Sequence, residues 1–222
     1  MKDLRRILPV GTILGLMLNL AGFAATVDIS ASYDTFLNSM SPDSNEGTAD
    51  YLWIAPGKNG LVQFDLSAIP PGQTITSAKL KIYVYYVQSN TTTYVYKETD
   101  SWTETGATWN KSDGTTAWAG SAGGYGAGMS SGTNVLDAVT VNSANSVFEW
   151  DVTSAAQDWY ANPAVNHGLL IERVPYGQGY KCYSREHTDG KPVLRITYEP
   201  VPEPATVGLL LAGFGLFSGC KK

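Results

Sequence analysis

The most constraining feature of this sequence is a strict two-residue alternation in the segment 78–85, which reads AKLKIYVY. In an extended chain, every second side chain points to the same face. A period of two is typical of a β-strand that is buried on one face, whereas an amphipathic helix needs a period near 3.6. The segment therefore predicts a half-buried strand with Ala78, Leu80, Ile82 and Val84 inward and Lys79, Lys81, Tyr83 and Tyr85 outward.

Eight further segments have strand-like patterns and are separated by turn-forming residues. The turns are expected at Pro56–Gly60, Ile69–Gly72 and Asp189–Pro192, where proline and glycine combine with polar residues. Many short strands with such turns are typical of a β-sandwich or jelly roll. The further strands are expected at Thr26–Ser32, Tyr51–Ile54, Leu61–Leu66, Thr93–Glu98, Val147–Val152, Leu169–Arg173, Tyr180–Arg185 and Val193–Tyr198.

One short helix and one long loop complete the expected domain. The helix is predicted over Ser154–Tyr160, with Asp151 or Thr153 as its cap and Asn162 before the terminating proline. The segment Ser112–Asn134 is rich in glycine and serine and predicts a long surface loop. Charged residues are only 16% of the chain, below the ~25% of a typical soluble protein, which argues against a helical bundle. The predicted fold class is all-β: a jelly-roll-like antiparallel β-sandwich with one short helix, flanked by hydrophobic targeting helices.

Both ends of the chain are apolar segments that we assign to targeting. A basic stretch at residues 2–6 precedes an apolar region that ends in small residues, which is the pattern of a secretory signal peptide. We place the signal peptide at residues 1–24, the domain at 25–200 and a tail at 201–222. A retained anchor helix is the alternative for the first segment, but its apolar region is short for a membrane span of ~20 residues.

The tail begins with Val201, Pro202, Glu203 and Pro204, continues with an apolar stretch and ends in two lysines. A proline-rich hinge, a short apolar helix and a basic end are what a membrane-held sorting signal requires, and a plain C-terminal anchor is the alternative. The order of these parts resembles the PEP-CTERM sorting signal. That resemblance implies export in a Gram-negative bacterium, processing by an exosortase after a signal peptidase, transient inner-membrane anchoring through a transmembrane helix, and a link to exopolysaccharide.

The charge of the domain limits its partners. Residues 25–200 contain 10 Lys and Arg against 18 Asp and Glu, a formal charge of 10 − 18 = −8. This balance argues against a nucleic-acid binder, and against tight binding of polyanions unless the charges are segregated on the surface. Cys182 is the one cysteine of this segment, so it has no disulfide partner there, and its place in an apolar strand predicts a buried, inert thiol.

An ordered series of short motifs resembles the DNRLRE domain over residues 28–198. The series includes Phe64-Asp65-Leu66-Ser67, Trp102-Thr103-Glu104, Trp150-Asp151-Val152-Thr153, Tyr183-Ser184-Arg185-Glu186 and Lys191-Pro192-Val193-Leu194-Arg195. That family is similar to β-sandwich carbohydrate-binding modules, some of them linked to alginate and other uronic-acid polymers. The resemblance implies a non-catalytic binding or adhesive module. One departure is Tyr125 after Gly123-Gly124, where the family often has an acidic residue, and it weakens the case for a ligand or metal contact there.

The outward side chains of the alternating strand are the candidate ligand contacts. Flat aromatic faces such as those of Tyr83 and Tyr85 stack on sugar rings, and the ammonium groups of Lys79 and Lys81 pair with uronate carboxylates. The alternative is an ordinary sheet surface, on which tyrosine is favoured for packing. Trp118 is a further candidate contact, because its long loop can expose it. Trp102, Trp109, Trp150 and Trp159 are expected in the core.

A structural calcium ion is a further expectation from the sequence. Asp34, Asn45 and Asp65 are the candidate ligands, because oxygen donors scattered over a sandwich suit this hard cation. Capping and turn roles are the alternative for these three residues. The pair Arg185-Glu186 is expected to be a structural ion pair rather than a site.

No catalytic constellation is evident in the sequence. His167 and His187 are both expected in solvated loops, without a paired nucleophile, and the carboxylates form no recognisable glycosidase pair. We therefore expect no enzyme activity and an exported carbohydrate-binding or matrix-associated module that acts with extracellular polysaccharide. A structural or adhesive biofilm-matrix protein that meets other proteins is the alternative, and a polysaccharide lyase or hydrolase is the third hypothesis.

Overall fold

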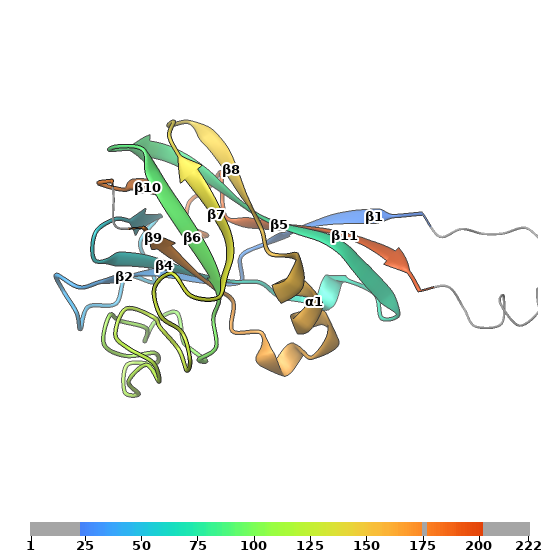
Figure 1. Ribbon diagram of the computed structural model, residues 1–222, viewed down its shortest axis with the longest axis horizontal. Coiled ribbons are helices and arrows are strands. Elements are labelled where there is room, and N and C mark those ends of the chain that lie inside the picture. The colour runs from blue at the N-terminus through green and yellow to red at the C-terminus, as the bar shows by residue number, and fades with distance from the viewer. Residues whose placement is uncertain (1–22, 175–176, 202–222) are drawn as a thin grey trace, which may run out of the picture. The chain divides into compact units, whose positions relative to one another are not determined.

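A computed structural model describes residues 23–174 and 177–201, in which two antiparallel β-sheets pack through a shared core (Figure 1). This confirms the predicted all-β sandwich with one short helix. The predicted signal peptide and nearly all of the tail lie outside the described residues, as do the helices expected in them. Within the described part of the chain, no helix is both long and apolar enough to cross a membrane.

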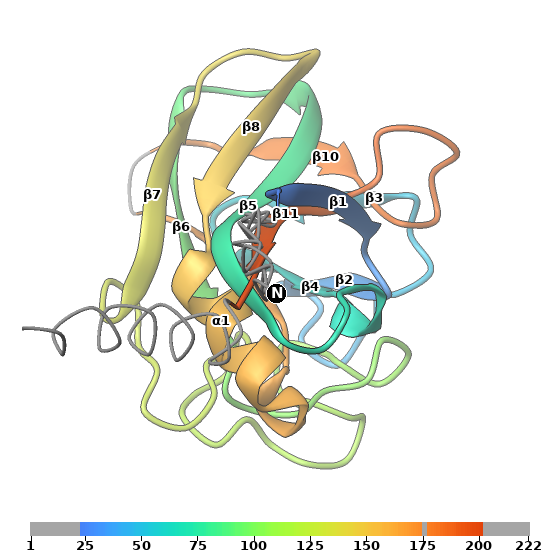
Figure 2. The same ribbon diagram turned by 90° about the vertical axis from the view of Figure 1, so that its right-hand side faces the viewer.

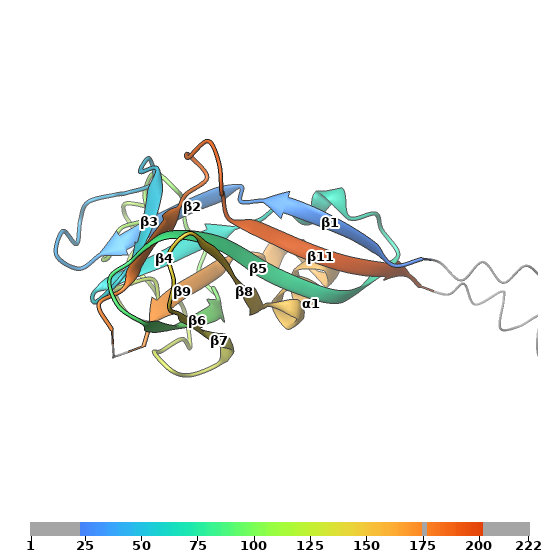
Figure 3. The ribbon, with the colours of Figure 1, turned by 90° about the horizontal axis from the view of Figure 1, so that it is seen from above.

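The first sheet has six strands and is organised around one long strand. β5 spans 15 residues: its first part, Gln73–Lys81, pairs with β11, its middle, Lys79–Val84, pairs with β8 on the other edge, and its end pairs with β10 (Figure 3). β1 continues the sheet beyond β11, and β3 continues it beyond β10. The strands are β1 (Ala25–Ser30), β3 (Tyr51–Ile54), β5 (Gln73–Val87), β8 (Ser146–Asp151), β10 (Tyr180–Tyr183) and β11 (Val193–Pro200).

The second sheet has five strands in the order β2-β4-β9-β6-β7, all antiparallel. Its inner face shares one hydrophobic cluster with the inner face of the first sheet, where Leu80, Ile82 and Val84 of β5 are fully buried. Each fully buried Leu, Ile or Val contributes ~1.5–3 kcal/mol, so this interface is the main source of stability. The strands are β2 (Tyr33–Asn38), β4 (Lys58–Gln63), β6 (Thr91–Lys97), β7 (Val135–Val141) and β9 (Leu169–Arg173).

The helix α1 (Thr153–Ala161) packs on β5 at one end of the sandwich (Figure 2). Ala155, Ala156 and Trp159 are its buried residues, and Asn162 follows its last residue. Its N-cap is Val152, which has no side-chain capping bond, whereas the Asp151 carboxylate accepts a hydrogen bond from the Thr153 amide at 3.0 Å. Two short 3-10 helices, Leu66–Ala68 and Pro163–Val165, lie in the connections.

The outer face of the second sheet is covered by the long loop, which extends from Glu98 to Asn134. Figure 1 shows this loop, in yellow-green, folded beneath β2 and β4. Side chains of the loop form a second hydrophobic cluster with outward side chains of the sheet. The fully buried or nearly buried members are Leu37, Leu61, Tyr96, Trp102, Ala107, Trp118 and Leu170. The strands β2, β4 and β9 of the second sheet are therefore mostly buried on both faces.

Several strand predictions need correction. β2 and β7 were not expected, and β4 begins at Lys58, inside the predicted turn Pro56–Gly60. The turn consists of two residues, because the backbone groups of Ala55 and Lys58 bond each other across it. The strand expected at Leu61–Leu66 ends at Gln63, and the strand expected at Tyr180–Arg185 ends at Tyr183.

Candidate functional site

The outward face of β5 is placed as predicted. Lys79, Lys81, Tyr83 and Tyr85 alternate with the buried core residues and are each partly exposed on the outer face of the first sheet. The strip is not one continuous surface, however, because β8 and β11 flank its first part while β10 and β3 flank its last part. The two parts have different chemistry.

The first part is a row of ion pairs. Lys79 donates to Asp151 on β8 at 2.7 Å, and the ammonium of Lys81 lies 3.3 Å from Glu149. On the other side, Arg195 of β11 makes two hydrogen bonds to Asp28 of β1. The bond from Lys79 holds the pKa of Asp151 at about 2, below its usual range. The two lysines that we expected to contact a ligand thus already have carboxylate partners.

The second part is a stack of aromatic rings centred on Tyr183. Its ring stacks on Tyr85 with the centroids 4.7 Å apart, on Tyr83 at 5.6 Å and on His187 at 3.6 Å. The turn at Gly190 lies against the same rings, because a Cβ there would come within 2.7 Å of Tyr183. Tyr83 and Tyr183 are therefore partly covered by the loop after β10. His187 was expected in solvent, but it is partly buried on this stack.

Beside this stack is a hollow of about 480 Å³, lined by Trp53, Tyr85, Tyr86, Gln88 and Lys181, which we call the aromatic hollow. Tyr86 is 47% exposed. Burial raises the pKa of Tyr85 to about 12, so its phenol is neutral and can donate a hydrogen bond. The strands β3, β5 and β10 supply four of the five residues, and Gln88 directly follows β5.

Lys181 gives the aromatic hollow a positive charge. Its ammonium lies 4.3 Å from the ring centroid of Tyr51 and 4.7 Å from that of Trp53. A second ammonium, from the buried Lys58, lies 4.5 Å from the Trp53 ring. Among the described residues, Lys181 has no carboxylate within salt-bridge distance, in contrast to Lys79 and Lys81.

A larger hollow of about 880 Å³ lies between the first 3-10 helix and α1. Its aromatic wall includes Trp159, which is 1% exposed and offers no free ring face, and Tyr160, whose hydroxyl bonds Pro70 and Gln73. The Asp65 carboxylate in this hollow accepts bonds from Ser67. Most of its polar groups are thus already used within the fold, and Tyr33 is its exposed aromatic residue.

Trp118 is not available to a ligand. The expectation that its loop exposes it is wrong, because its side chain is 5% exposed in the second hydrophobic cluster. Its indole N–H donates to the Thr108 carbonyl at 3.0 Å, so its polar atom is satisfied internally. Trp102, Trp150 and Trp159 are buried as predicted, and Trp109 packs against the second cluster.

The predicted calcium ligands are not gathered as a set. Asn45 uses its amide in a turn, where it donates to the Glu104 and Ala107 carbonyls and accepts from the Gly47 amide. Asp65 caps the first 3-10 helix. These are the turn and capping roles that we gave as the alternative for Asn45 and Asp65. Asp34, the third predicted ligand, lies in a different group of carboxylates.

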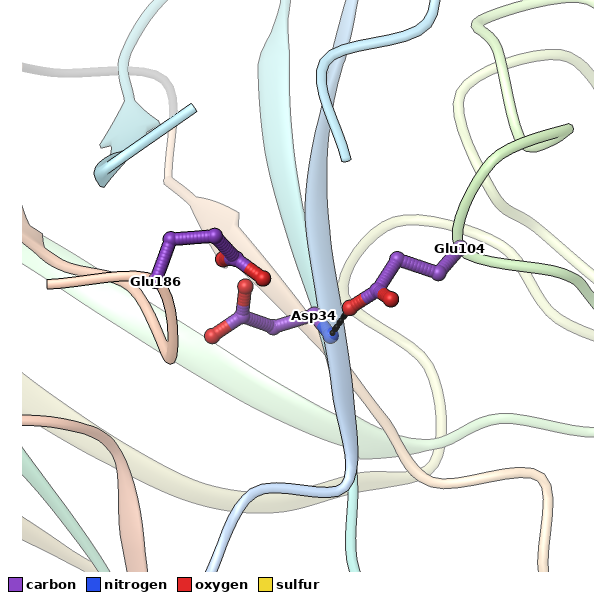
Figure 4. Close-up of side chains that lie close together, drawn as sticks. All are labelled: Asp34, Glu104 and Glu186. Carbon is purple, nitrogen blue, oxygen red and sulfur yellow. Dashed lines mark hydrogen bonds between the residues drawn. The ribbon is translucent and has the colours of Figure 1, made fainter. Parts of the chain in front are cut away.

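Asp34 lies between Glu104 and Glu186, which approach it from the loop after β6 and the loop after β10 (Figure 4). Glu104 accepts a hydrogen bond from the Asp34 amide at 3.0 Å, and Arg185 bridges both oxygens of Glu104 at 3.1 Å. Arg185 also lies 3.5 Å from Glu186, which confirms the expected pair. Burial, reinforced by the two neighbouring carboxylates, raises the pKa of Asp34 to about 8.

Cys182 is fully buried, as expected, and burial raises the pKa of its thiol far above the ordinary value. Such a thiol stays protonated and is a poor nucleophile. Cys182 therefore offers no exposed, reactive sulfur atom.

Comparison with known families finds two matches, one to a family of carbohydrate-binding modules and one to a sorting motif. Residues 25–125, from β1 into the long loop, match carbohydrate-binding module family 96, and residues 200–222 match the PEP-CTERM protein-sorting motif. These matches confirm the resemblance to a carbohydrate-binding β-sandwich with a PEP-CTERM tail; the name DNRLRE is consistent with them but is not shown by them. The sorting motif indicates a protein of a Gram-negative bacterium that is exported and processed by an exosortase.

Other comparisons add little. None of the curated proteins searched matches the chain. A chain in the cryo-electron microscopy structure of mud crab tombus-like virus aligns at 14% sequence identity over 95% of this chain and 100% of its own. Its TM-score of 0.29 is too low to support any argument about fold or function.

The sequence analysis predicted one of the residues that line the aromatic hollow and missed the others. Tyr85 was expected, while Trp53, Tyr86, Gln88 and Lys181 were not. Tyr51 and Trp53 alternate with the buried Leu52 and Ile54, so the signal for an outward face was present in β3. What the sequence did not give was the pairing of β3 and β5 with β10, which brings these faces together.

Proposed function

We propose that this protein is a non-catalytic module that binds extracellular polysaccharide in the aromatic hollow. The observation that carries the proposal is an unpaired lysine set among partly exposed aromatic rings, in a chain that matches a carbohydrate-binding module family. The rings of Tyr85, Tyr86 and Trp53 offer apolar faces for sugar rings, and Lys181 offers a cation. An aromatic wall with a few placed polar groups is the usual make-up of a small-molecule site.

The proposed ligand is a polymer that contains uronic acid. The ammonium of Lys181 is free to pair with a sugar carboxylate, and a charge-assisted hydrogen bond is about twice as strong as a neutral one. The nearby cations Lys79, Lys81 and Arg195 are already paired. The hollow thus has a cation without a carboxylate partner among the described residues, although the domain as a whole carries an excess of acidic residues.

The aromatic stack behind the hollow would help binding by holding the site in place. Tyr85 is fixed by Tyr183, which is fixed in turn by His187. An immobilised ring loses little rotamer freedom when a ligand binds, and ordering each free side chain otherwise costs ~0.5–1.5 kcal/mol. Tyr83, which we expected to contact sugar directly, would then support the site by stacking on Tyr183.

The test is a titration of the purified protein with alginate oligosaccharides and with a neutral glucan of similar length. We expect tighter binding of the uronate polymer, weakened by salt because a charge pair contributes. Tyr86→Ala should lower the affinity about twofold to tenfold, by analogy with the ~0.5–1.5 kcal/mol of aromatic pairs. Lys181→Met should lower the affinity for the uronate polymer about tenfold or more and change binding of the neutral glucan little.

The matched control is Tyr33→Ala. Tyr33 is 49% exposed, almost the same as Tyr86, but it lines the larger hollow beside α1. Unchanged affinity in Tyr33→Ala and a clear loss in Tyr86→Ala would support the proposal. The reverse result would move the binding site to the larger hollow, and release of reducing ends or unsaturated sugars by the pure protein would refute the non-catalytic assignment.

The cellular role follows from the sorting motif. An exported chain processed by an exosortase meets polysaccharide outside the cell, so we propose that the module associates with exopolysaccharide of the surface or biofilm matrix. Transient anchoring through the tail is part of this proposal. Intact mass of the exported protein should correspond to the span 25–200, and recovery of full-length chain from the cell envelope would contradict it.

A further inference from the structure

Three carboxylates from distant parts of the sequence converge at one point on the edge of the second sheet. Asp34 lies on β2, Glu104 in the loop after β6 and Glu186 in the loop after β10 (Figure 4). One oxygen from each residue lies within 4.8 Å of the others. Calcium binds oxygen at 2.3–2.6 Å, so two ligands of one ion lie at most about 5 Å apart. The present separation therefore suits a single bound ion.

The charges of the group are not balanced. Three carboxylates carry three negative charges when ionised, and Arg185 is the cation that pairs with them in the described part of the chain. This leaves a formal charge of −3 + 1 = −2. A divalent cation would neutralise this excess.

An independent observation points to a missing ligand. Asp34 is only 1% exposed, and its Oδ1 atom has no hydrogen-bond partner, whereas Oδ2 accepts from the Arg185 amide at 2.7 Å. A buried polar atom without a partner costs free energy, and native proteins rarely leave one unsatisfied. Figure 4 shows the Asp34 carboxylate facing that of Glu186, so this buried side chain points into the group.

We propose that Asp34, Glu104 and Glu186 bind a calcium ion. All three ligands are oxygen donors, which favours a hard cation over zinc or copper. They come from three separate segments, and calcium tolerates irregular sets of oxygen ligands better than magnesium, which demands near-ideal octahedral geometry. Extracellular calcium modules work with Kd values of ~10⁻⁴–10⁻³ M, and the sorting motif places this protein in that environment.

The ion would join three parts of the fold, in addition to the hydrogen bonds that already link Asp34, Glu104 and Arg185. It would hold the long loop and the loop after β10 against β2. The binding would stabilise the folded state without requiring a sugar, so this inference does not depend on the proposed carbohydrate function.

The experiment measures the thermal midpoint of the purified protein in EDTA and in CaCl₂ at equal ionic strength. At 10 mM CaCl₂, ~100-fold above a Kd of ~0.1 mM, Tm should rise by about 5–10 °C. MgCl₂ at the same concentration should give a clearly smaller rise. Calorimetric titration with CaCl₂ should give one site per chain.

Glu186→Gln is the decisive variant, because Glu186 is the most exposed of the three residues and its replacement keeps the side-chain shape. It should lose most of the calcium-dependent rise while keeping its Tm in EDTA. Asp189→Asn is the control: this exposed carboxylate lies in the same loop and outside the group, and the variant should keep the full rise. An equal Tm of the wild-type protein in EDTA and CaCl₂, an equal rise with MgCl₂, or a full rise in Glu186→Gln would overturn the proposal.

Discussion

The outer faces of the two sheets carry aromatic residues for opposite purposes. At the second sheet, Trp118 of the long loop packs against outward side chains of the sheet, and its indole N–H is satisfied by the chain itself. On the first sheet, Tyr86 is about half exposed beside an unpaired Lys181. The difference teaches that the number of aromatic residues on a face says little about binding. What matters is whether the chain itself already covers their rings and pairs their polar neighbours.

The largest change in stability should come from truncating a side chain of the loop that covers the outer face of the second sheet. Trp118→Ala removes a nearly buried indole and its hydrogen bond to Thr108, which should lower the free energy of unfolding by ~3–5 kcal/mol. Chemical denaturation would measure this loss. Tyr86→Ala, the equivalent truncation on the open face, should stay within about 0.5 kcal/mol of the wild type. A loss below ~1 kcal/mol in Trp118→Ala would mean that the loop does not hold the second sheet.

The second-largest effect should be a pH dependence of the unfolding free energy, which arises in the long loop that covers the second sheet. Glu98 is buried at the start of the long loop, and burial raises its pKa to about 8 although the amides of Thr99 and Asp100 donate to it. The folded state therefore favours the protonated acid. This contribution to stability is complete below the unfolded pKa near 4.5 and declines as the pH rises towards 8.

Glu98→Gln should remove that decline. Between pH 5 and 8 the stability of the wild-type protein should fall relative to that of the variant, by at most ~1.4 kcal/mol per pH unit. Urea unfolding of both proteins across this range isolates Glu98, because Asp34, whose pKa is also raised, is present in both. Parallel stability profiles for the two proteins would show that Glu98 does not control the pH response.

The smallest effect should come from the ion pairs of the open face. Lys79 and Asp151 are both substantially exposed, so Lys79→Met should change the unfolding free energy by only ~0.2–1 kcal/mol. Because Lys79 already has a partner, its loss should also leave the affinity for alginate oligosaccharides unchanged. A drop in affinity as large as that expected for Lys181→Met would make Lys79 a direct contact after all.

The same contrast explains how much the sequence could predict. On the first sheet one face is in the core and one is open, so alternation in β5 marked both faces correctly. On the second sheet both faces are covered, and β2 and β4 are buried over four and five consecutive residues. Such strands lose the period of two, and β2 also contains a buried Asp34, which strand patterns do not suggest.

The sites depend on contacts that no local pattern records. Lys79 and Lys181 look alike in the sequence, since both lie on outward faces of strands. Their difference arises from the neighbours across the sheet, which are Asp151 for Lys79 and Trp53 for Lys181. The carboxylate group around Asp34 likewise combines residues separated by 70 and 152 positions, so only the fold brings them together.

Hydroxyl-radical footprinting tests the central claim most directly, because it compares the two exposed tyrosines within one sample. In the free protein Tyr33 and Tyr86, which are 49% and 47% exposed, should be oxidised at similar rates. With saturating alginate oligosaccharide, oxidation of Tyr86 and Trp53 should fall while that of Tyr33 and Trp118 stays unchanged. Protection of Tyr33 with Tyr86 still reactive would contradict the account and place the ligand beside α1.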